Sequence, residues 1–258
     1  MAKYPFTYNQ EIGHQGQSLV PHFPGGLSGV TIGPGYDMGS RSPQEIYQDL
    51  TRAGVPAATA ELFMEAAYKT GDEAQAWVAA HRHELSINEV QQATLFDEVL
   101  VPEYERRMRS QLELLAHQND GISHDMIVWE NLSEKQKHIL FDFTYNPGLT
   151  KFPTLTEAVL RQDWDTVYES YQRFSAGQPL SYRNDSFYYT FLDPNAPPIE
   201  SIPIEVAEVL PETAELITDL WSDTLYEAPP SVEEILDTPL LPDSPSSELE
   251  SDDWANAL

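Results

Sequence analysis

Two isolated carboxylates, Glu11 and Asp37, are the residues near the start of the chain that could carry out acid–base chemistry. The chain holds 42 acidic residues, yet these two are the only ones among the first 40 positions. Hydrolysis of a glycosidic bond needs one carboxyl group that stays protonated to assist the leaving oxygen. It needs a second that stays ionised, to activate water or to stabilise charge on the sugar. The isolation of the pair therefore indicates two carboxylates with separate roles.

The sequence around each carboxylate favours a different protonation state. Glu11 ends the run YPFTYNQE, where aromatic and uncharged neighbours would remove it from water and favour the protonated acid. Asp37 lies among glycines, whose backbone N–H groups would donate to it and keep it ionised. Each residue also has a simpler interpretation, because an isolated glutamate is usually a surface charge and an aspartate beside glycine usually belongs to a turn.

The backbone of the stretch SGVTIGPGYDMG, residues 28–39, decides whether Asp37 faces the same way as Thr31. A tight two-residue turn at Pro34-Gly35 would put Thr31 and Asp37 on opposite faces. A single extended strand would leave room for a sugar chain and would put four residues on one face, namely Thr31, Gly33, Gly35 and Asp37. The sequence allows both conformations.

A glycine-rich segment followed by a set of helices must position these residues. Residues 1–40 hold eight of the 13 glycines and predict loops and short strands. From Ser42 onward the sequence predicts helices, several of which begin with a capping box. The boxes are Ser42 with Glu45, Ser86 with Glu89, and Ser133 with Gln136. The helices are predicted over about 43–53, 57–69, 73–84, 87–117 and 134–147, with two short ones in 153–174. A small β lobe followed by a larger helical lobe indicates an α+β domain.

Composition excludes several classes of protein. The formal net charge of −28 argues against a nucleic-acid partner, which needs a basic surface, and the absence of cysteine excludes disulfides and thiol nucleophiles. His14 and His22 lack the spacing of a metal motif, so we interpret them as loop histidines and expect no metal or other cofactor. Without a long apolar run or the layout of a signal peptide, we expect no membrane partner and a chain made in the cytoplasm.

Charge and proline content divide the chain into two predicted parts, 1–195 and 196–258. All 14 lysines and arginines precede residue 184, whereas the second part holds 16 acidic residues, nine of the 20 prolines and no glycine. Such a composition buries too little apolar surface to form a core, so we expect an acidic, largely disordered tail. The tail would dock on a secretion carrier or on the first domain, or it would be a solvated segment with no specific role.

Several motifs resemble one family. The stretch SGVTIGPGYDMG, preceded by QEIGHQG and LVP, resembles the lysozyme-like catalytic domain of pesticin-type bacterial toxins, which are relatives of the phage lysozymes. LSEKQKHILFDFTYNPG is similar to the phage-lysozyme helix that runs into an aromatic-Asn-x-Gly turn, and FPTLTEAVLRQDWDTVYESYQRF to the helix pair after it. YRNDSFYYTFL falls where the family has a basic closing helix, with Arg183 as the one remaining member of its usual basic pair. The resemblance spans about residues 4–192.

The resemblance implies a lysozyme-like fold and muramidase activity, the hydrolysis of the β-1,4 bond between N-acetylmuramic acid and N-acetylglucosamine in peptidoglycan. It implies that Glu11 is the general acid, Asp37 the second carboxylate and Thr31 the hydroxyl that helps to hold the attacking water. In phage lysozymes the second carboxylate precedes the threonine, whereas here it follows it, as in pesticin. From the family we expect inversion at the anomeric carbon, with retention and lytic transglycosylation as alternatives.

Five further residues are expected to contact the sugar strand. The glycines would leave space for it, and the tyrosines and the asparagine would stack on it or bind its amides. The set is Gly33, Gly35, Tyr36, Tyr145 and Asn146. For the two tyrosines, packing in the core or at a helix end is an equal alternative.

Three functions from different classes fit these features. The first is an antibacterial effector that is delivered into the periplasm of a target bacterium, with peptidoglycan strands as substrate and a cognate immunity protein as partner. The second is a phage endolysin, against which the acidic tail argues. The third is a non-catalytic wall-binding or structural module, against which the joint presence of Glu11, Thr31 and Asp37 argues.

Overall fold

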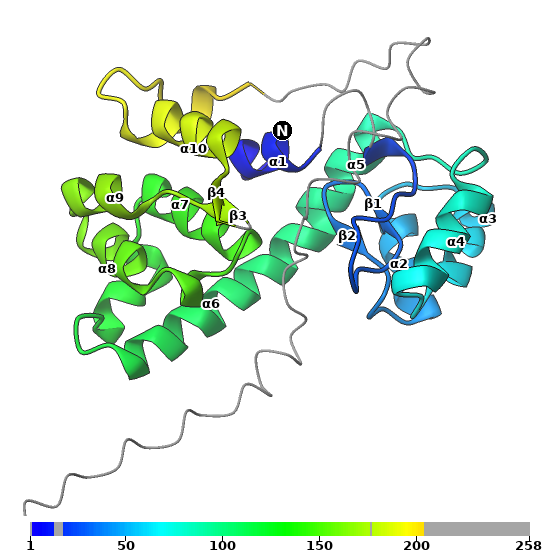
Figure 1. The fold of residues 1–258 in the computed structure, drawn as a ribbon, viewed down its shortest axis with the longest axis horizontal. Helices are drawn as coiled ribbons and strands as arrows, with labels where there is room; N and C mark the ends of the chain where they lie inside the picture. The colour runs from blue at the N-terminus through cyan, green and yellow to red at the C-terminus, as the bar shows by residue number, and fades with distance from the viewer. Residues whose placement is uncertain (1, 13–17, 176, 204–258) are drawn as a thin grey trace, which may run out of the picture.

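The computed structural model describes residues 2–12, 18–175 and 177–203, which form two lobes joined by one long helix (Figure 1). The small lobe contains β1 (Thr31–Ile32), β2 (Tyr36–Asp37), α2 (Pro43–Arg52), α3 (Ala57–Phe63), α4 (Gly71–His81) and α5 (Glu89–Leu95). The helical lobe contains α1 (Pro5–Glu11), α7 (Glu134–Tyr145), α8 (Pro153–Arg161), α9 (Trp164–Ser170), β3 (Phe174–Ser175), β4 (Gln178–Pro179) and α10 (Ser181–Phe187). Helix α6 (Val101–Gln118) runs from one lobe to the other. This mixture confirms the predicted α+β class.

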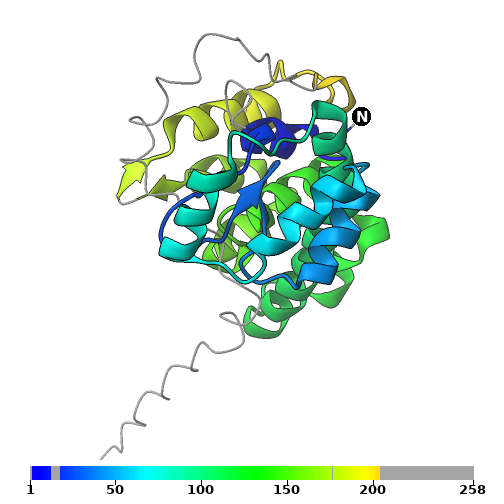
Figure 2. The same ribbon diagram turned by 90° about the vertical axis from the view of Figure 1, so that its right-hand side faces the viewer.

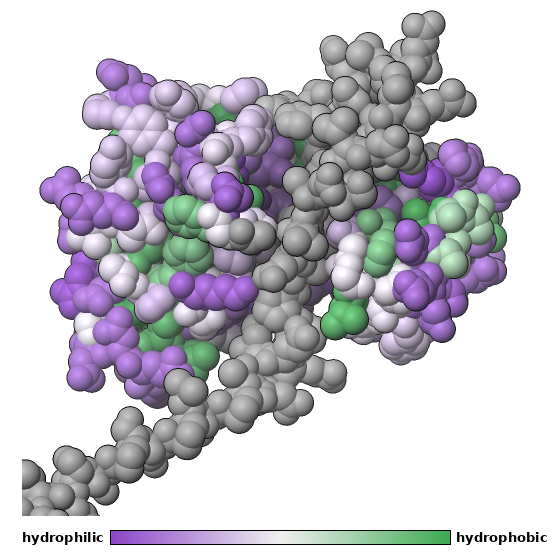
Figure 3. Space-filling model, viewed as in Figure 1, coloured by the Kyte–Doolittle hydropathy of each residue, from purple (hydrophilic) through white to green (hydrophobic). Residues whose placement is uncertain are grey.

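Short helical turns complete the described chain. They are 3₁₀ turns at Met64–Ala66, His124–Ile127, Trp129–Asn131, Leu149–Lys151 and Ile199–Ser201, and π-helical turns at Phe96–Leu100 and Tyr188–Leu192. Figure 2 looks onto the small lobe, whose strands and helices lie in front of the helical lobe. The visible described surface of both lobes is largely hydrophilic, with smaller apolar areas (Figure 3). Within the described residues, no helix is both long and apolar enough to cross a membrane.

Two of the three predicted capping boxes are confirmed. Ser42 caps α2, since its Oγ accepts from the backbone N of Glu45 at 3.2 Å and its own N donates to Glu45 Oε2 at 2.8 Å. The same reciprocal pair, between Ser133 and Gln136, begins α7. Each pair satisfies two backbone donors that the first helical turn leaves without an intrahelical partner.

The third predicted box, at Ser86 and Glu89, is wrong. The N-cap of α5 is Asn88, whose Oδ1 accepts from Gln91 N while its own N donates to Gln91 Oε1, both at 2.9 Å. Just before this cap, the backbone N of Ile87 donates to Leu19 O at 2.9 Å. This contact with a distant loop holds the chain outside the helix until Asn88, so the box forms two residues later than predicted.

The long helix between the lobes runs from α5 through the π-helical turn into α6. Pro102 lies in the first turn of α6 and has no N–H to donate to the carbonyl of Glu98, one turn earlier. A missing bond of this kind is accommodated by a local π turn, and here that turn covers Phe96–Leu100. The helix therefore continues past the proline and fixes the small lobe to the helical lobe.

Aromatic contacts hold α1 against the helical lobe. The ring of Tyr4 stacks on that of Phe141 in α7, with centroids 3.7 Å apart and an interplanar angle of 3°. Phe6 meets Phe187 and Phe191 edge-on. These contacts are fully buried, and they bring the end of α1, where Glu11 lies, beside α7 and α10.

The predicted boundary at residue 195 does not mark the end of the packed chain. Ile199 and Ile202 pack against the core, and Asn9 Nδ2 donates to Pro203 O at 2.7 Å. The rest of the predicted tail, 204–258, lies outside the described residues, as does His14.

Candidate active site

Glu11 lies at the C-terminal end of α1, and its carboxylate binds an arginine from α10. Arg183 Nη1 donates to Glu11 Oε1 at 2.6 Å, although the two residues are 172 positions apart. The Glu11 side chain is 6% exposed. The sequence predicts an apolar pocket here, which is only half right, since Glu11 is buried but ion-paired. The sequence around Glu11 does not show this pairing, because Arg183 lies on a helix 172 positions later.

Behind this pair lies Asp142, a fully buried carboxylate in the middle of α7. Its Oδ1 accepts from Arg183 Nη2 at 2.7 Å and from Thr7 Oγ1 at 3.1 Å. Its Oδ2 accepts from Arg173 Nη2 at 2.5 Å. Arg183 therefore bridges Asp142 and Glu11, and its fixed planar donors determine where the Glu11 carboxylate sits.

Arg173 is the second guanidinium of the network, and the sequence analysis did not single it out. Its side chain is 1% exposed and lies 3.6 Å from the centroid of the Phe143 ring. Burial lowers the pKa of Arg173 to about 10, against the opposing effect of Asp142, so it stays charged at neutral pH. Burial alone would raise the pKa of Asp142, but the two arginines hold it below its ordinary value. Two acids thus balance two bases inside the helical lobe.

Asp37 lies in the hairpin of the small lobe, whose register differs from both predicted conformations. The chain turns over three residues, Gly33 to Gly35, and Thr31 pairs directly with Asp37. Directly opposed residues of an antiparallel pair share a face, so Thr31 and Asp37 point to the same side. Gly33 and Gly35 have φ of +62° and +95°, which other residues adopt rarely. The positive φ values explain why a three-residue turn forms instead of a continuous strand or a two-residue turn.

The Asp37 carboxylate is held by the backbone, as the sequence predicts. Gly29 N lies 3.1 Å from both carboxylate oxygens, and Gly39 N donates to Oδ1 at 2.6 Å. Thr31, which is buried, donates from Oγ1 to Gly29 O at 3.3 Å. Gly29 therefore contacts both candidate residues of the small lobe, one through its N–H and the other through its carbonyl.

Gly29→Ala is expected to displace Asp37. A Cβ at position 29 would lie 2.3 Å from Asp37 Oδ1 and 2.3 Å from Gly39 N, so the carboxylate or the backbone must move. We expect a loss of about 1–3 kcal/mol in the free energy of unfolding, measured by urea denaturation. The matched control is Ser28→Ala, next in the chain, whose buried hydroxyl has no hydrogen-bond partner among the described residues. Equal stability of the two variants would contradict the expected clash.

One family model matches the chain. It is described as Domain of unknown function (DUF8812) and covers residues 5–172. The chain belongs to the DUF8812 family. No curated protein matches it. The matched region contains Glu11, Thr31, Asp37 and Asp142 and ends one residue before Arg173.

Within the DUF8812 region, the tyrosines predicted to stack on sugar are core residues. Tyr36 is 0% and Tyr145 1% exposed. Tyr36 Oη donates to Asp49 Oδ2 at 2.9 Å, and the guanidinium of Arg41 covers its ring. Burial raises the pKa of Tyr36 well above its ordinary range. The ring-stacking role is therefore corrected to the packing alternative, because neither ring offers a free face.

The predicted glycines also contact protein in this structure. A Cβ on Gly35 would lie 3.3 Å from Tyr145 Oη, and one on Gly33 would lie 3.2 Å from Leu95 Cδ2. Tyr145 also donates from Oη to Pro34 O, so α7 supports the hairpin turn. The space that these glycines were expected to leave for sugar is thus taken by α5 and α7. Asn146, the C-cap of α7, is partly exposed. Its contact with the sugar strand remains a prediction.

His22, which the sequence suggests is a loop histidine, lies beside the candidate residues of the small lobe. It forms an antiparallel bridge with Thr31, whose other neighbour is Asp37. The side chains of His22, Thr31 and Asp37 therefore share one face, in a row. His22 Nδ1 lies 3.3 Å from Val20 O, which favours a proton on that nitrogen. The sequence does not show that His22 pairs with Thr31, because this pairing depends on how the loop between residues 22 and 31 folds.

His22 is expected to make the protein less stable in mild acid. Burial lowers its pKa, and so does Arg82, whereas the Val20 carbonyl and Asp37 act in the opposite direction. The unfolded chain then takes up more protons than the folded one below about pH 6.5, and stability falls there as the pH falls. Thermal melts between about pH 7.5 and 5.5 should show a smaller loss for His22→Gln than for the wild type. The exposed His83→Gln is the control and should follow the wild type.

Proposed function

We propose that this chain is a lysozyme-like muramidase, which hydrolyses the β-1,4 bond between N-acetylmuramic acid and N-acetylglucosamine. The observation that supports this best is the contrast between the two carboxylates. Glu11 is held by an arginine side chain in the helical lobe, and Asp37 is held by backbone N–H groups in the small lobe. Two carboxylates in such different surroundings suit the two roles that glycoside hydrolysis needs.

Glu11 is the general acid of the proposed reaction. A protonated carboxyl group still has a carbonyl oxygen, so Oε1 can accept from Arg183 while the second oxygen carries the proton. Protonation leaves Arg183 paired, because its Nη2 already donates to Asp142. Glu11 then gives its proton to the glycosidic oxygen as the bond to the anomeric carbon breaks.

Asp37 and Thr31 act on the water in the proposed reaction. Asp37 accepts the proton of the attacking water, and Thr31, on the same face of the hairpin, helps to position that water. Hydrogen bonds from Gly29 N and Gly39 N hold the Asp37 carboxylate in place for this role. A single displacement of this kind inverts the anomeric carbon.

Product analysis tests the proposal. Purified peptidoglycan is digested with the full chain, and the soluble fragments are separated and weighed by mass spectrometry. New reducing ends are expected. Fragments with 1,6-anhydro ends would indicate a lytic transglycosylase and would contradict the role of Asp37. If no fragments were released, the chain would be a non-catalytic wall-binding module.

The setting that we propose follows from the sequence resemblance. The chain would be an antibacterial effector that acts on the peptidoglycan of a target bacterium. A cognate immunity protein would protect the producing cell. The acidic composition of residues 196–258, which the resemblance does not reach, suits docking on a secretion carrier.

A further inference from the structure

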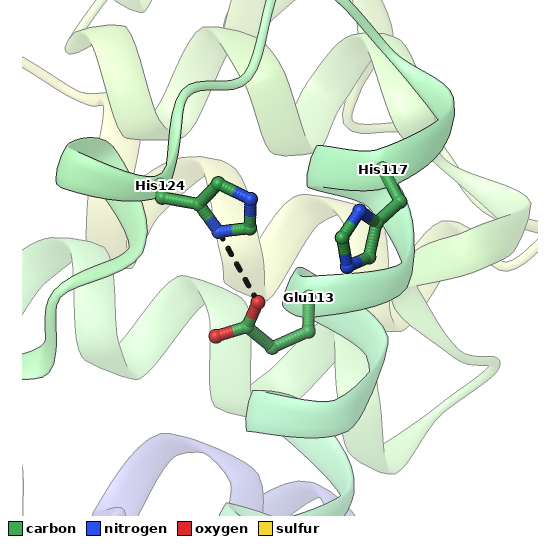
Figure 4. Close-up of side chains that lie close together, drawn as sticks. All are labelled: Glu113, His117 and His124. Carbon is green, nitrogen blue, oxygen red and sulfur yellow. Dashed lines mark ion pairs between the residues drawn. The ribbon is translucent and has the colours of Figure 1, made fainter.

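The C-terminal end of α6 lies far from the β1–β2 hairpin (Figure 1). Three side chains converge there. Glu113, His117 and His124 each offer one ligand atom, and these atoms all lie within 4.8 Å of one another. Figure 4 shows Glu113 and His117 on adjacent turns of α6 and His124 on the short helix after it, all pointing into one space. We propose that these three residues bind a divalent transition-metal ion of the Zn²⁺ class.

The backbone on both sides of this space is well defined. Glu113 and His117 are four residues apart on one helix and so share a face. His124 follows a turn in which Gly121 N donates to Asn119 Oδ1 at 2.8 Å and Arg161 Nη2 donates to Gly121 O at 2.6 Å. The third ligand is therefore brought to α6 by a fixed turn, and binding would need little ordering of the chain.

One distance between ligand atoms already suits a tetrahedral ion. Ligand bonds of 2.0–2.2 Å at tetrahedral angles separate neighbouring ligand atoms by about 3.3–3.5 Å. His124 Nδ1 lies 3.3 Å from Glu113 Oε2, which is within that range. The rings of His117 and His124 have centroids 5.3 Å apart, and both residues are exposed, so a side-chain rotation completes the set.

The ligand types select the metal. Two imidazoles and one carboxylate suit Zn²⁺ and its neighbours, whereas Mg²⁺ and Ca²⁺ need a larger set of oxygen ligands. His117 lies in the last turn of α6, where the helix dipole favours a positive charge. Three protein ligands leave the fourth position to water or to a ligand from outside.

In the sequence, only His14 and His22 suggest metal ligands. The ligands follow the pattern E-x₃-H-x₆-H, and the second spacing crosses the end of a helix. The three ligands come together because the turn after α6 brings His124 back to Glu113 and His117. The proposal therefore departs from the expectation of no metal, and it is independent of the chemistry proposed for Glu11.

Calorimetry on the full chain tests the site. The protein is stripped with a chelator, dialysed and titrated with ZnCl₂, and in a second experiment with MgCl₂. We expect one Zn²⁺ per chain at micromolar concentration and no Mg²⁺ binding. His117→Ala and His124→Ala should each weaken Zn²⁺ binding by about tenfold or more, because each removes a ligand. The exposed His83→Ala is the matched control and should bind as the wild type does.

A second measurement separates this site from a loose surface contact. Zn²⁺ should raise the melting temperature of the wild type and of His83→Ala but not of the two ligand variants, because the ion binds the folded state. All three histidines are exposed, so the variants should fold. The proposal is overturned if the wild type binds no Zn²⁺, or if the ligand variants bind it as tightly as the control. Glu113 and His124 would then form an ion pair only.

Discussion

Replacing Glu11 with glutamine should lower the rate of peptidoglycan hydrolysis by about 10²–10⁴-fold, the usual contribution of a general acid. Glutamine keeps an oxygen that accepts from Arg183, so the position of the side chain changes little. It has no acidic proton to give to the leaving oxygen. The measurement is the initial rate of release of reducing ends from purified peptidoglycan, with equal amounts of folded protein confirmed by circular dichroism.

Glu105→Gln is the matched control for this variant. Glu105 lies on α6 and, like Glu11, accepts from a cationic side chain, here Lys3 at 2.7 Å; it also accepts from Tyr4 Oη at 2.6 Å. It has no place in the proposed chemistry, so its variant should keep wild-type activity. An active wild type together with a Glu11→Gln rate within tenfold of it would assign the acid to another residue.

Replacing Asp142 with asparagine is expected to lower the free energy of unfolding by about 3–5 kcal/mol, the usual cost of breaking a buried ion pair. Asp142 forms ion pairs with both Arg173 and Arg183, and the three side chains are at most 10% exposed. Asparagine leaves these two buried guanidinium groups without a counter-charge on α7. Urea denaturation at neutral pH measures the effect. The exposed Asp185→Asn on α10 is the control, with a change of about 0.5 kcal/mol or less.

Asp142 also determines how the stability of the protein changes at low pH. The pKa of Asp142 is lower in the folded chain than its unfolded value of about 3.9. Its stabilisation is therefore complete above that value and is lost as the pH falls through the folded pKa. Below about pH 4 the gap in stability between the wild type and Asp142→Asn should narrow. A gap that stays constant down to pH 2 would contradict the assigned pairing.

Asp142 and Glu11 are coupled through Arg183, which links stability to the proposed chemistry. One nitrogen of Arg183 binds Asp142 and the other binds Glu11. Without Asp142, the Arg183 guanidinium can move, and the Glu11 carboxylate that it binds can move with it. Asp142 is thus a positioning residue for Glu11, and Asp142→Asn should lower kcat even at temperatures where the variant stays folded.

Some features of the fold could be predicted because they depend on a few neighbouring residues. The caps at Ser42 and Ser133 use a side chain and backbone groups within three positions, so their sequence pattern is sufficient. The box at Ser86 failed because Ile87 is held by Leu19, a residue far away in the sequence. The same applies to the tyrosines, since a sequence does not show which side of a ring another segment covers.

The sequence by itself determined the α+β class, most helix starts, and the isolation of Glu11 and Asp37 from other acidic residues along the chain. The tertiary structure decided how those two carboxylates are held. Glu11 pairs with an arginine 172 positions away, and the hairpin register places Thr31 beside Asp37 and His22. Ion pairs and registers of this kind depend on which distant side chains fill the same space, whereas a helix cap is complete within one turn.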